Sequence, residues 1–358
     1  MADIYIGYGS NMQEITRQLM EEANVYSQIE PSMKIGIKPN LVVAKEASGG
    51  ATTHPEIVEG IIQYLQGKGH KNITILEGSW VGDRTKRAFE VCGYNQLAKQ
   101  YGVKIVDTQQ DTSRKVKAGK MELAICQSAL EMDYLINVPV LKAHCQTDMT
   151  CCLKNMKGCI PDSEKRRYHT MGLHGPIAAL ATVLKPSLHI IDGICGDLTF
   201  EEGGNPVAAG RILLGFDGVL MDSYCAGLLG YHPDEIGYLQ KAHQAGAGAY
   251  ADSSTQVLEL NPEERPVGLP QASNIARRLA KHIEEDSACS ACYAALIFAL
   301  NRVGDRGLAP GEKIKIGQGF RGKTAEGLGV GNCTRGCTQF VKGCPPSAVD
   351  IAEALQRR

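Results

Sequence analysis

The chain has 358 residues, more than one typical compact domain contains, so we expect two domains. Hydrophobic residues make up 43% of it and the formal net charge is −1, which gives no electrostatic reason to expect nucleic acid or an anionic membrane as a partner. The sequence has no run of about 18 apolar residues and no signal peptide, so we expect a cytoplasmic protein. Its 13 cysteines therefore point to metal or redox chemistry more than to disulfides.

Short apolar runs alternate with longer amphipathic stretches over residues 1–220. The predicted strands are Ile4–Tyr8, Lys34–Leu41, Asn72–Leu76, Val103–Val106, Tyr134–Val138, Leu188–Ile191 and Arg211–Leu214. The predicted helices include Gln13–Glu22, Thr53–Gln66 and Pro176–Leu184. Thr53 and Glu56 have the spacing of a capping box, and Ser113–Gly119 is predicted to be a loop. This alternation predicts an α/β fold with a mostly parallel sheet and helices on both faces.

A second domain is predicted after the segment Asn261–Pro270, whose three prolines break any helix or strand. Gln271–Glu285 has the pattern of a helix, and the composition then shifts toward glycine and cysteine. Five of the 13 cysteines fall within residues 289–344. We therefore predict an α/β domain over residues 1–265 and a small, cysteine-rich α+β domain over residues 271–358.

The cysteines of the second domain have the spacing of a metal site. They occur as C289-S-A-C292, C333-T-R-G-C337 and C344-P-P346. A [4Fe–4S] cluster takes four thiolates, and its last ligand is often followed by proline, as at Cys344. Structural zinc is the alternative, with two knuckles formed by Cys289/Cys292 and Cys333/Cys337. A third alternative is that these are buried cysteines without a ligand.

Residues 317–324 read GQGFRGKT and match the pattern of a phosphate-binding loop. Such a loop needs a helix directly after its lysine, because the free N–H groups of the helix start hold the phosphates. Alternating glycines at 327, 329 and 331 disfavour a helix there. We expect these glycines to let the backbone pass close to a cluster instead.

Polar residues follow several predicted strands of the first domain, where ligands bind in parallel α/β sheets. They predict a cationic pocket for a small anionic substrate, with histidine as acid or base. The predicted catalytic residues are Lys142, His144 and Lys154. The predicted substrate-binding residues are Lys38, Asn40, Thr53, His54, Asn155, Lys157 and His174. The competing interpretation is that these are solvated residues of surface loops.

Four further cysteines lie within the same polar segment. They are Cys145, Cys151, Cys152 and Cys159. A second metal site is one interpretation, but neighbouring cysteines are awkwardly placed to bind one ion together. Small buried cysteines are the interpretation that we favour.

Several segments together resemble one protein family. They are KPNLV (38–42), TTHPEIV (52–58), NVPVLKAH (137–144), LKNMKG (153–158), IIDGI (190–194) and the C-terminal cysteine pattern. The combination resembles the domain of unknown function 362 family. The resemblance implies a [4Fe–4S] cluster held by Cys289, Cys292, Cys333 and Cys344, with Cys337 as the alternative ligand. This chain departs from the family after IIDGI, where it reads GDLTFEEGGNPVAAG (196–210).

Three functions are compatible with these patterns. The favoured one is an iron–sulfur oxidoreductase of anaerobic metabolism, in which the cluster exchanges electrons with a small anionic substrate. The second is a non-redox iron–sulfur lyase or hydrolase in which one iron is open to substrate. The third is a non-enzymatic electron carrier or redox sensor that docks on a redox partner protein.

Overall fold

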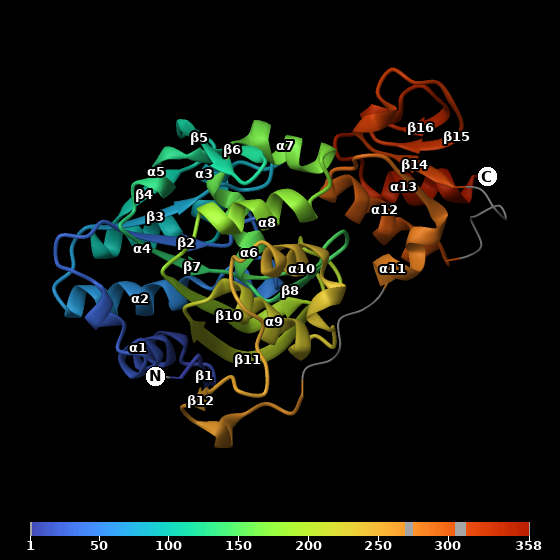
Figure 1. The fold of residues 1–358 in the computed structure, drawn as a ribbon. Coiled ribbons are helices and arrows are strands. Elements are labelled where there is room, and N and C mark those ends of the chain that lie inside the picture. Colours follow the sequence, from blue (N-terminus) through green and yellow to red (C-terminus); the bar gives the residue numbers. More distant parts are fainter. Residues whose placement is uncertain (1, 269–274, 305–312, 358) are drawn as a thin grey trace.

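A computed structural model describes residues 2–268, 275–304 and 313–357. Its largest element is an eight-stranded sheet with the strand order β12-β1-β11-β10-β7-β2-β3-β4 (Figure 1). In that order the strands are Val257–Glu259, Ile4–Tyr8, Pro206–Gly215, Leu188–Asp197, Tyr134–Val138, Ile35–Pro39, Ile73–Glu77 and Lys104–Asp107. Strand β11 is antiparallel to both neighbours, and the other neighbouring pairs are parallel. The predicted mostly parallel sheet is confirmed.

The central strands are buried on both faces, as the continuous apolar runs of the sequence predict. Every residue of β1, β2, β3 and β7 is buried. Side chains of β1 alternate between two cores, with Ile4 and Ile6 in one and Tyr5 in the other. Strands β10 and β11 are longer than predicted and form a hairpin, whose connecting loop, residues 198–205, reaches the candidate site described below.

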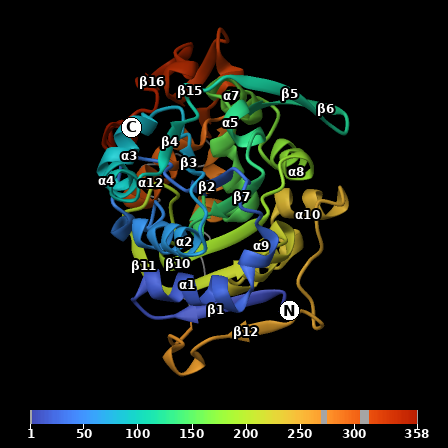
Figure 2. The ribbon, with the colours of Figure 1, turned by 90° about the vertical axis from the view of Figure 1, so that its left-hand side faces the viewer.

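Helices cover both faces of the sheet, as predicted. The helices of this part of the chain are α1 Met12–Glu22, α2 Pro55–Gly67, α3 Thr85–Val91, α4 Tyr94–Tyr101, α5 Gln127–Leu130, α6 Cys152–Asn155, α7 Asp162–Thr170, α8 His174–Val183, α9 Gly218–Leu228 and α10 Gly237–Gln244. Helices α1, α2 and α4 pack into one core, and α6, α8, α9 and α10 into the other. Figure 2 shows α2 and α4 on one side of the sheet and α8 and α10 on the other.

Two local predictions were wrong. Thr53 does not cap α2, because its hydroxyl donates to the Val138 carbonyl at 2.7 Å and accepts the Asn40 N–H at 2.8 Å. The capping position is taken by His54, whose side chain makes no capping bond. The predicted loop at 113–119 is strand β5, Ser113–Ala118, which pairs with β6, Met121–Cys126. Its side chains are mostly exposed, so a polar sequence there is compatible with a strand.

The C-terminal part has its own parallel sheet, in the order β13-β14-β15-β16. These strands are Ile283–Glu285, Ile314–Ile316, Ala325–Val330 and Cys337–Val341. Its helices are α11 Ile275–Leu279, α12 Ser290–Val303 and α13 Ala348–Gln356. A separate apolar core lies between the sheet and α12 and α13. Figure 1 shows this unit at one end of the molecule, beyond α7.

The predicted helix Gln271–Glu285 was wrong at its end, where residues 283–285 form β13. Its first residues, 271–274, lie outside the described part of the chain, as do 269 and 270 of the predicted linker. The rest of that linker contains one short 3-10 turn, Pro262–Glu264. Helix α13 begins shortly after the proline pair Pro345-Pro346, and the Ser347 hydroxyl caps it by accepting the Asp350 N–H.

The loop 198–205 ties the two parts together. Phe200 is buried in the C-terminal core, where its ring lies 5.5 Å from that of Phe298 on α12. Asp197 holds the loop by accepting the backbone N–H groups of Thr199, Phe200 and Asn205. A segment of the first part is therefore fixed by the second.

Candidate functional site

A small cavity lies at the carboxyl ends of β2 and β3, where the sequence predicts a ligand. Its volume is about 90 Å³. Five predicted residues line it: Lys38, Asn40, Lys154, Asn155 and Lys157. The structure adds residues that the sequence did not indicate: Glu77, Trp80, Lys165, Glu201 and Glu202. His169, which follows the lysines in the sequence, lines the cavity as well.

Lys38 lines this cavity, and its ammonium uses all of its hydrogen-bond donors within the protein. Its buried ammonium donates to Glu77 Oε2 at 2.6 Å, Asn155 Oδ1 at 2.8 Å and the Pro39 carbonyl at 2.8 Å. An ammonium has three donors, so none remains for a ligand. Lys38 therefore fixes the site and neutralises Glu77 rather than adding free positive charge.

Glycine at 158 is required by this ion pair. A Cβ atom at Gly158 would lie 1.9 Å from Glu77 Oε1 and 2.6 Å from Lys38 Cε. Neither atom can move away, because both belong to a buried, hydrogen-bonded pair. The motif LKNMKG thus ends in glycine for a steric reason.

The three predicted catalytic residues converge on Glu201. Lys154 Nζ lies 2.5 Å from Glu201 Oε1, and His144 Nε2 lies 2.8 Å from Oε2. Lys142 Nζ donates to the Glu201 carbonyl at 2.9 Å and to the Ala51 carbonyl at 2.5 Å. Lys142 and His144 do not line the cavity, whereas Lys154 does. Their shared contact, Glu201, lies in a loop, where the sequence has no periodic pattern that could identify it.

His144 is held as a neutral imidazole. Its Nδ1 accepts the backbone N–H groups of Gln146 and Thr147 at 3.0 and 3.1 Å, so the proton is on Nε2, which faces Glu201. The Glu201 carboxylate lies 2.8 Å from this Nε2 atom. Burial lowers the pKa of His144 to about 4, although Glu201 opposes the shift. Burial likewise lowers the pKa of Lys142 to about 8.

The remaining predicted binding residues lie elsewhere. The Thr53 hydroxyl bridges backbone groups, as described above. His54 pairs with Asp192, with its Nδ1 and its backbone nitrogen both 2.8 Å from Asp192 Oδ2. His174 lines a different cleft, next to Asp148 and Glu235. These residues do not join the lysines at the ends of β2 and β3.

A second cavity of about 90 Å³ lies between the C-terminal part and the loop after β3. Four thiols line it: Cys289, Cys292, Cys333 and Cys344. Cys337 does not line it, because its side chain on β16 is buried beside Gly329. Cys289 and Cys292 come from the start of α12, Cys333 from the turn after β15, and Cys344 from the segment before α13.

The two cavities share a wall. Trp80, Val81, Cys289 and Ala291 line both. Trp80 and Val81 belong to the loop between β3 and α3, while Cys289 and Ala291 belong to the C-terminal part. The folding of both parts is therefore needed to build this wall.

The phosphate-loop pattern is not followed by a helix. Gly322, Lys323 and Thr324 lead directly into β15, which begins at Ala325. The pattern therefore has no helix N-terminus to hold phosphates, as the glycines predict.

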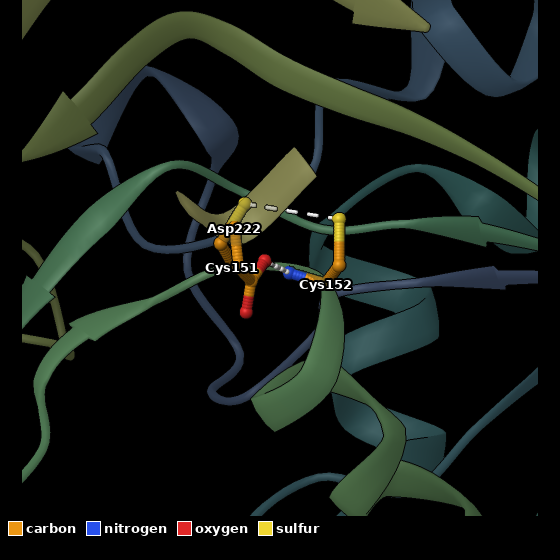
Figure 3. Close-up of side chains that lie close together, drawn as sticks. All are labelled: Cys151, Cys152 and Asp222. Atoms are coloured by element: carbon orange, nitrogen blue, oxygen red, sulfur yellow. Dashed lines mark hydrogen bonds between the residues drawn. The ribbon is translucent and has the colours of Figure 1, made fainter. Parts of the chain in front are cut away.

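A separate buried group consists of Cys151, Cys152 and Asp222, whose candidate ligand atoms lie within 4.8 Å of one another (Figure 3). The two sulfurs are 3.9 Å apart. Asp222 accepts the N–H groups of Cys152 and Leu153 at 2.6 and 3.2 Å, and the Tyr238 hydroxyl at 3.2 Å. The Asp222 carboxylate thus accepts the free N–H groups at the start of α6, the helix that contains Lys154 and Asn155.

Residues 35–227 match the model of a family described as a domain of unknown function, DUF362, and the chain belongs to this family. The thylakoid-associated protein sll1697 of Synechocystis sp. is 26% identical over 185 residues, which are 50% of this chain and 56% of that protein. The chain thus spans about half the length of this curated relative. Every helix in the described part of the chain is too short or too polar to cross a lipid bilayer.

Two solved structures resemble part of the chain. The lactate racemase apoprotein of Thermoanaerobacterium thermosaccharolyticum is 12% identical, with a TM-score of 0.41 over 63% of this chain and 57% of that one. A protein from Thermotoga maritima is 12% identical, with a TM-score of 0.40 over 66% of this chain and 59% of that one.

Proposed function

We propose that this protein is a [4Fe–4S] oxidoreductase that acts on a small anionic substrate. The observation that carries the proposal is the wall shared by the thiol-lined cavity and the cavity at the ends of β2 and β3. Cys289, Cys292, Cys333 and Cys344 would hold the cluster, within a C-terminal domain that we place at residues 271–358. A bound cluster would supply one-electron transfer across this wall.

The spacing of the four thiols supports a cluster over zinc. No three of these four described sulfurs lie within 4.8 Å of one another. Tetrahedral zinc, with Zn–S bonds of about 2.3 Å, would bring all four sulfurs to about 3.8 Å from each other. A four-iron cluster binds each thiolate to a different iron and so holds the sulfurs further apart.

The surroundings of the thiols suit the negative charge that four thiolates bring. Arg321 Nε donates to Cys333 Sγ at 3.3 Å, and Arg166 also lines the cavity. Gly331, with φ +91°, turns the chain beside Cys292 in a conformation that other residues rarely adopt. Hydrogen bonds to sulfur and nearby cations are among the features that set the potential of such clusters.

The substrate cavity offers fixed polar groups next to the wall that it shares with the thiol-lined cavity. Lys154 and Asn155 are buried and oriented by Glu201 and Lys38 respectively. Lys157 lines the cavity without a carboxylate partner in the described part of the chain. Held in this way, these residues can orient a small anion against the wall that contains Cys289.

The first test is the iron and acid-labile sulfide content of anaerobically purified protein, with EPR before and after dithionite. The proposal expects about four of each per chain, from the cluster stoichiometry, and a signal that appears on reduction. Cys337→Ser is the matched control and should retain iron, whereas Cys289→Ser, Cys292→Ser and Cys333→Ser should lose it. Zinc without sulfide would refute the proposal.

The exposure of Cys344 favours a second function, electron exchange with a redox partner protein. Cys344→Ser tests the remaining candidate, a non-redox lyase or hydrolase in which one iron is open to substrate. Loss of iron in all four single variants excludes a lyase with an iron that lacks a protein thiolate, and retention only in Cys344→Ser supports it. We place the protein in the cytoplasm, where reducing conditions keep the four cysteines available as ligands.

A further inference from the structure

The charges around the substrate cavity are almost all paired. Lys38 pairs with Glu77 at 2.6 Å, and Lys154 with Glu201 at 2.5 Å. Lys165, a further lining residue, contacts Asp162 at 3.1 Å and two backbone carbonyls. These groups neutralise one another before any ligand binds.

Two lining residues stand outside this pairing, Lys157 and Glu202. Within the described ranges, neither side chain has a hydrogen bond or an ion pair, and they do not pair with each other. Lys157 projects from the turn after α6, and Glu202 from the loop 198–205. One unpaired cation and one unpaired carboxyl therefore border the same small space.

The pKa values of Lys157 and Glu202 are both shifted in favour of the neutral side chain, as expected for buried groups without an ion-pair partner. Burial lowers the pKa of Lys157 to about 7, with Lys154 adding to the shift. Burial raises the pKa of Glu202 to about 7, with Glu201 adding to it. A bound anion beside Lys157 and a bound donor beside Glu202 would each stabilise the charged form of the side chain.

The size of the cavity limits the ligand. About 90 Å³ is less than the engineered apolar cavity of about 150 Å³ that holds benzene. A ligand of roughly four or five non-hydrogen atoms, fewer than the six of benzene, fits this space. Nucleotides, sugars and peptides are too large to be enclosed here.

We propose that the cavity binds a carboxylate of about two carbons that carries a hydroxyl or amino group on the adjacent carbon. Its carboxylate contacts Lys157 and its donor group contacts Glu202. This inference rests on the proposed function, because it names the substrate class of the same cavity. It adds Glu202 as the residue that distinguishes this class from simple carboxylates, since a donor pairs with the carboxyl and a methyl group leaves it unpaired.

Trp80 provides the readout, because it lines the cavity and is the only tryptophan in the chain. Anaerobically purified full-length protein is titrated with glycolate, glycine and acetate, following tryptophan fluorescence and the melting temperature. We expect glycolate or glycine to bind about tenfold or more tightly than acetate, as for a hydrogen bond to a charged group. The stronger of the two identifies the donor as hydroxyl or amino.

Two variants assign the contacts. Lys157→Met should abolish binding of all three probes, and Glu202→Gln should reduce the preferred probe to the affinity of acetate. The matched controls are the exposed Lys99→Met and Glu30→Gln, which should bind as the unmodified protein does. If Lys157→Met does not fold, Lys157→Gln removes the charge while keeping a donor.

Equal affinity for acetate, unchanged binding in Lys157→Met, or no binding of any probe would each overturn the inference. The iron content measured on the same sample keeps the two proposals distinguishable. Iron without probe binding contradicts the substrate class alone. Probe binding without iron contradicts the oxidoreductase and leaves the substrate class standing.

Discussion

The ammonium of Lys154 lies 2.5 Å from Glu201 Oε1, and this contact joins helix α6 to the loop between β10 and β11. Both side chains are largely buried, with 4% and 12% of their surface exposed. The same carboxylate faces His144, and the carbonyl of the same residue accepts Lys142. One loop residue thus organises three side chains that the sequence marked as catalytic.

Glu201→Gln should destabilise the fold by about 3–5 kcal/mol, because it leaves the buried Lys154 ammonium without its counter-charge. Urea denaturation measures the free energy of unfolding. Glu284→Gln is the control, since Glu284 pairs with Lys315 while half-exposed and should cost at most about 1 kcal/mol. Equal costs for the two variants would show that the Glu201 pair has no special role.

Gly158→Ala should destabilise the fold by about 1–3 kcal/mol or more, because the added methyl group meets Glu77 and Lys38. Gly67→Ala is the matched control. It lies in α2 with no atom near its added Cβ, so it should be neutral or should stabilise by up to about 1 kcal/mol. Thermal unfolding of both variants checks the difference, and a stable Gly158→Ala would contradict the described packing.

Phe200→Ala should loosen the loop 198–205 from the C-terminal core. The expected loss is about 3 kcal/mol, typical of a buried phenylalanine. Because Phe200 and Glu201 hold one loop, the double variant with Glu201→Gln should cost less than the sum of the two single variants. Phe340→Ala, at an exposed position, is the control with a small effect. Strict additivity in urea denaturation would argue against a shared loop.

His144 should make the fold sensitive to acid. Its pKa is about 4 in the folded protein and 6.5 without burial, so the unfolded chain binds the proton first as pH falls. The stability that neutral His144 contributes is present above pH 6.5 and is lost as pH falls from about 6.5 to 4. The loss reaches at most about 1.4 kcal/mol per pH unit for this residue.

His144→Asn tests this pH dependence, because the asparagine oxygen can accept the same backbone N–H groups and does not titrate. The variant should show a smaller fall in unfolding free energy between pH 7 and pH 5 than the unmodified protein. His232→Asn, at an exposed histidine, should leave the fall unchanged. An identical pH profile for His144→Asn would place the acid sensitivity in other residues.

The sequence identified most of the sheet, because buried parallel strands have continuous apolar runs. Strands β1 and β7 have the predicted bounds, and β2, β3 and β4 differ by one or two residues. It missed β5, whose exposed side chains are polar, its partner β6, the short strand β12 and the extra length of the β10–β11 hairpin. Composition distinguishes buried strands from loops well and exposed strands poorly.

The four cysteines that line one cavity were named from spacing and family resemblance, and the structure brings them together. The polar residues fared differently. Five of the ten line the cavity at the ends of β2 and β3, four make buried contacts elsewhere, and His174 lines a different cleft. Glu201 and Glu202 lie in the stretch 196–210, which departs from the family pattern. That departure was the one feature of the sequence that could have drawn attention to them.

The amino-acid sequence by itself determined the α/β class and the mostly parallel sheet, because the burial of a strand is recorded in its local run of apolar residues. Cysteine spacing predicted a metal site in the C-terminal part, and the family resemblance chose among its five cysteines. The tertiary structure decided which charges are free. Whether Lys38, Lys154 or Lys157 can meet a substrate depends on Glu77 and Glu201, which are 39 and 47 residues away from their partners. These ion pairs are set by the packing of loops that are distant in the sequence, and no periodic pattern of residues predicts them.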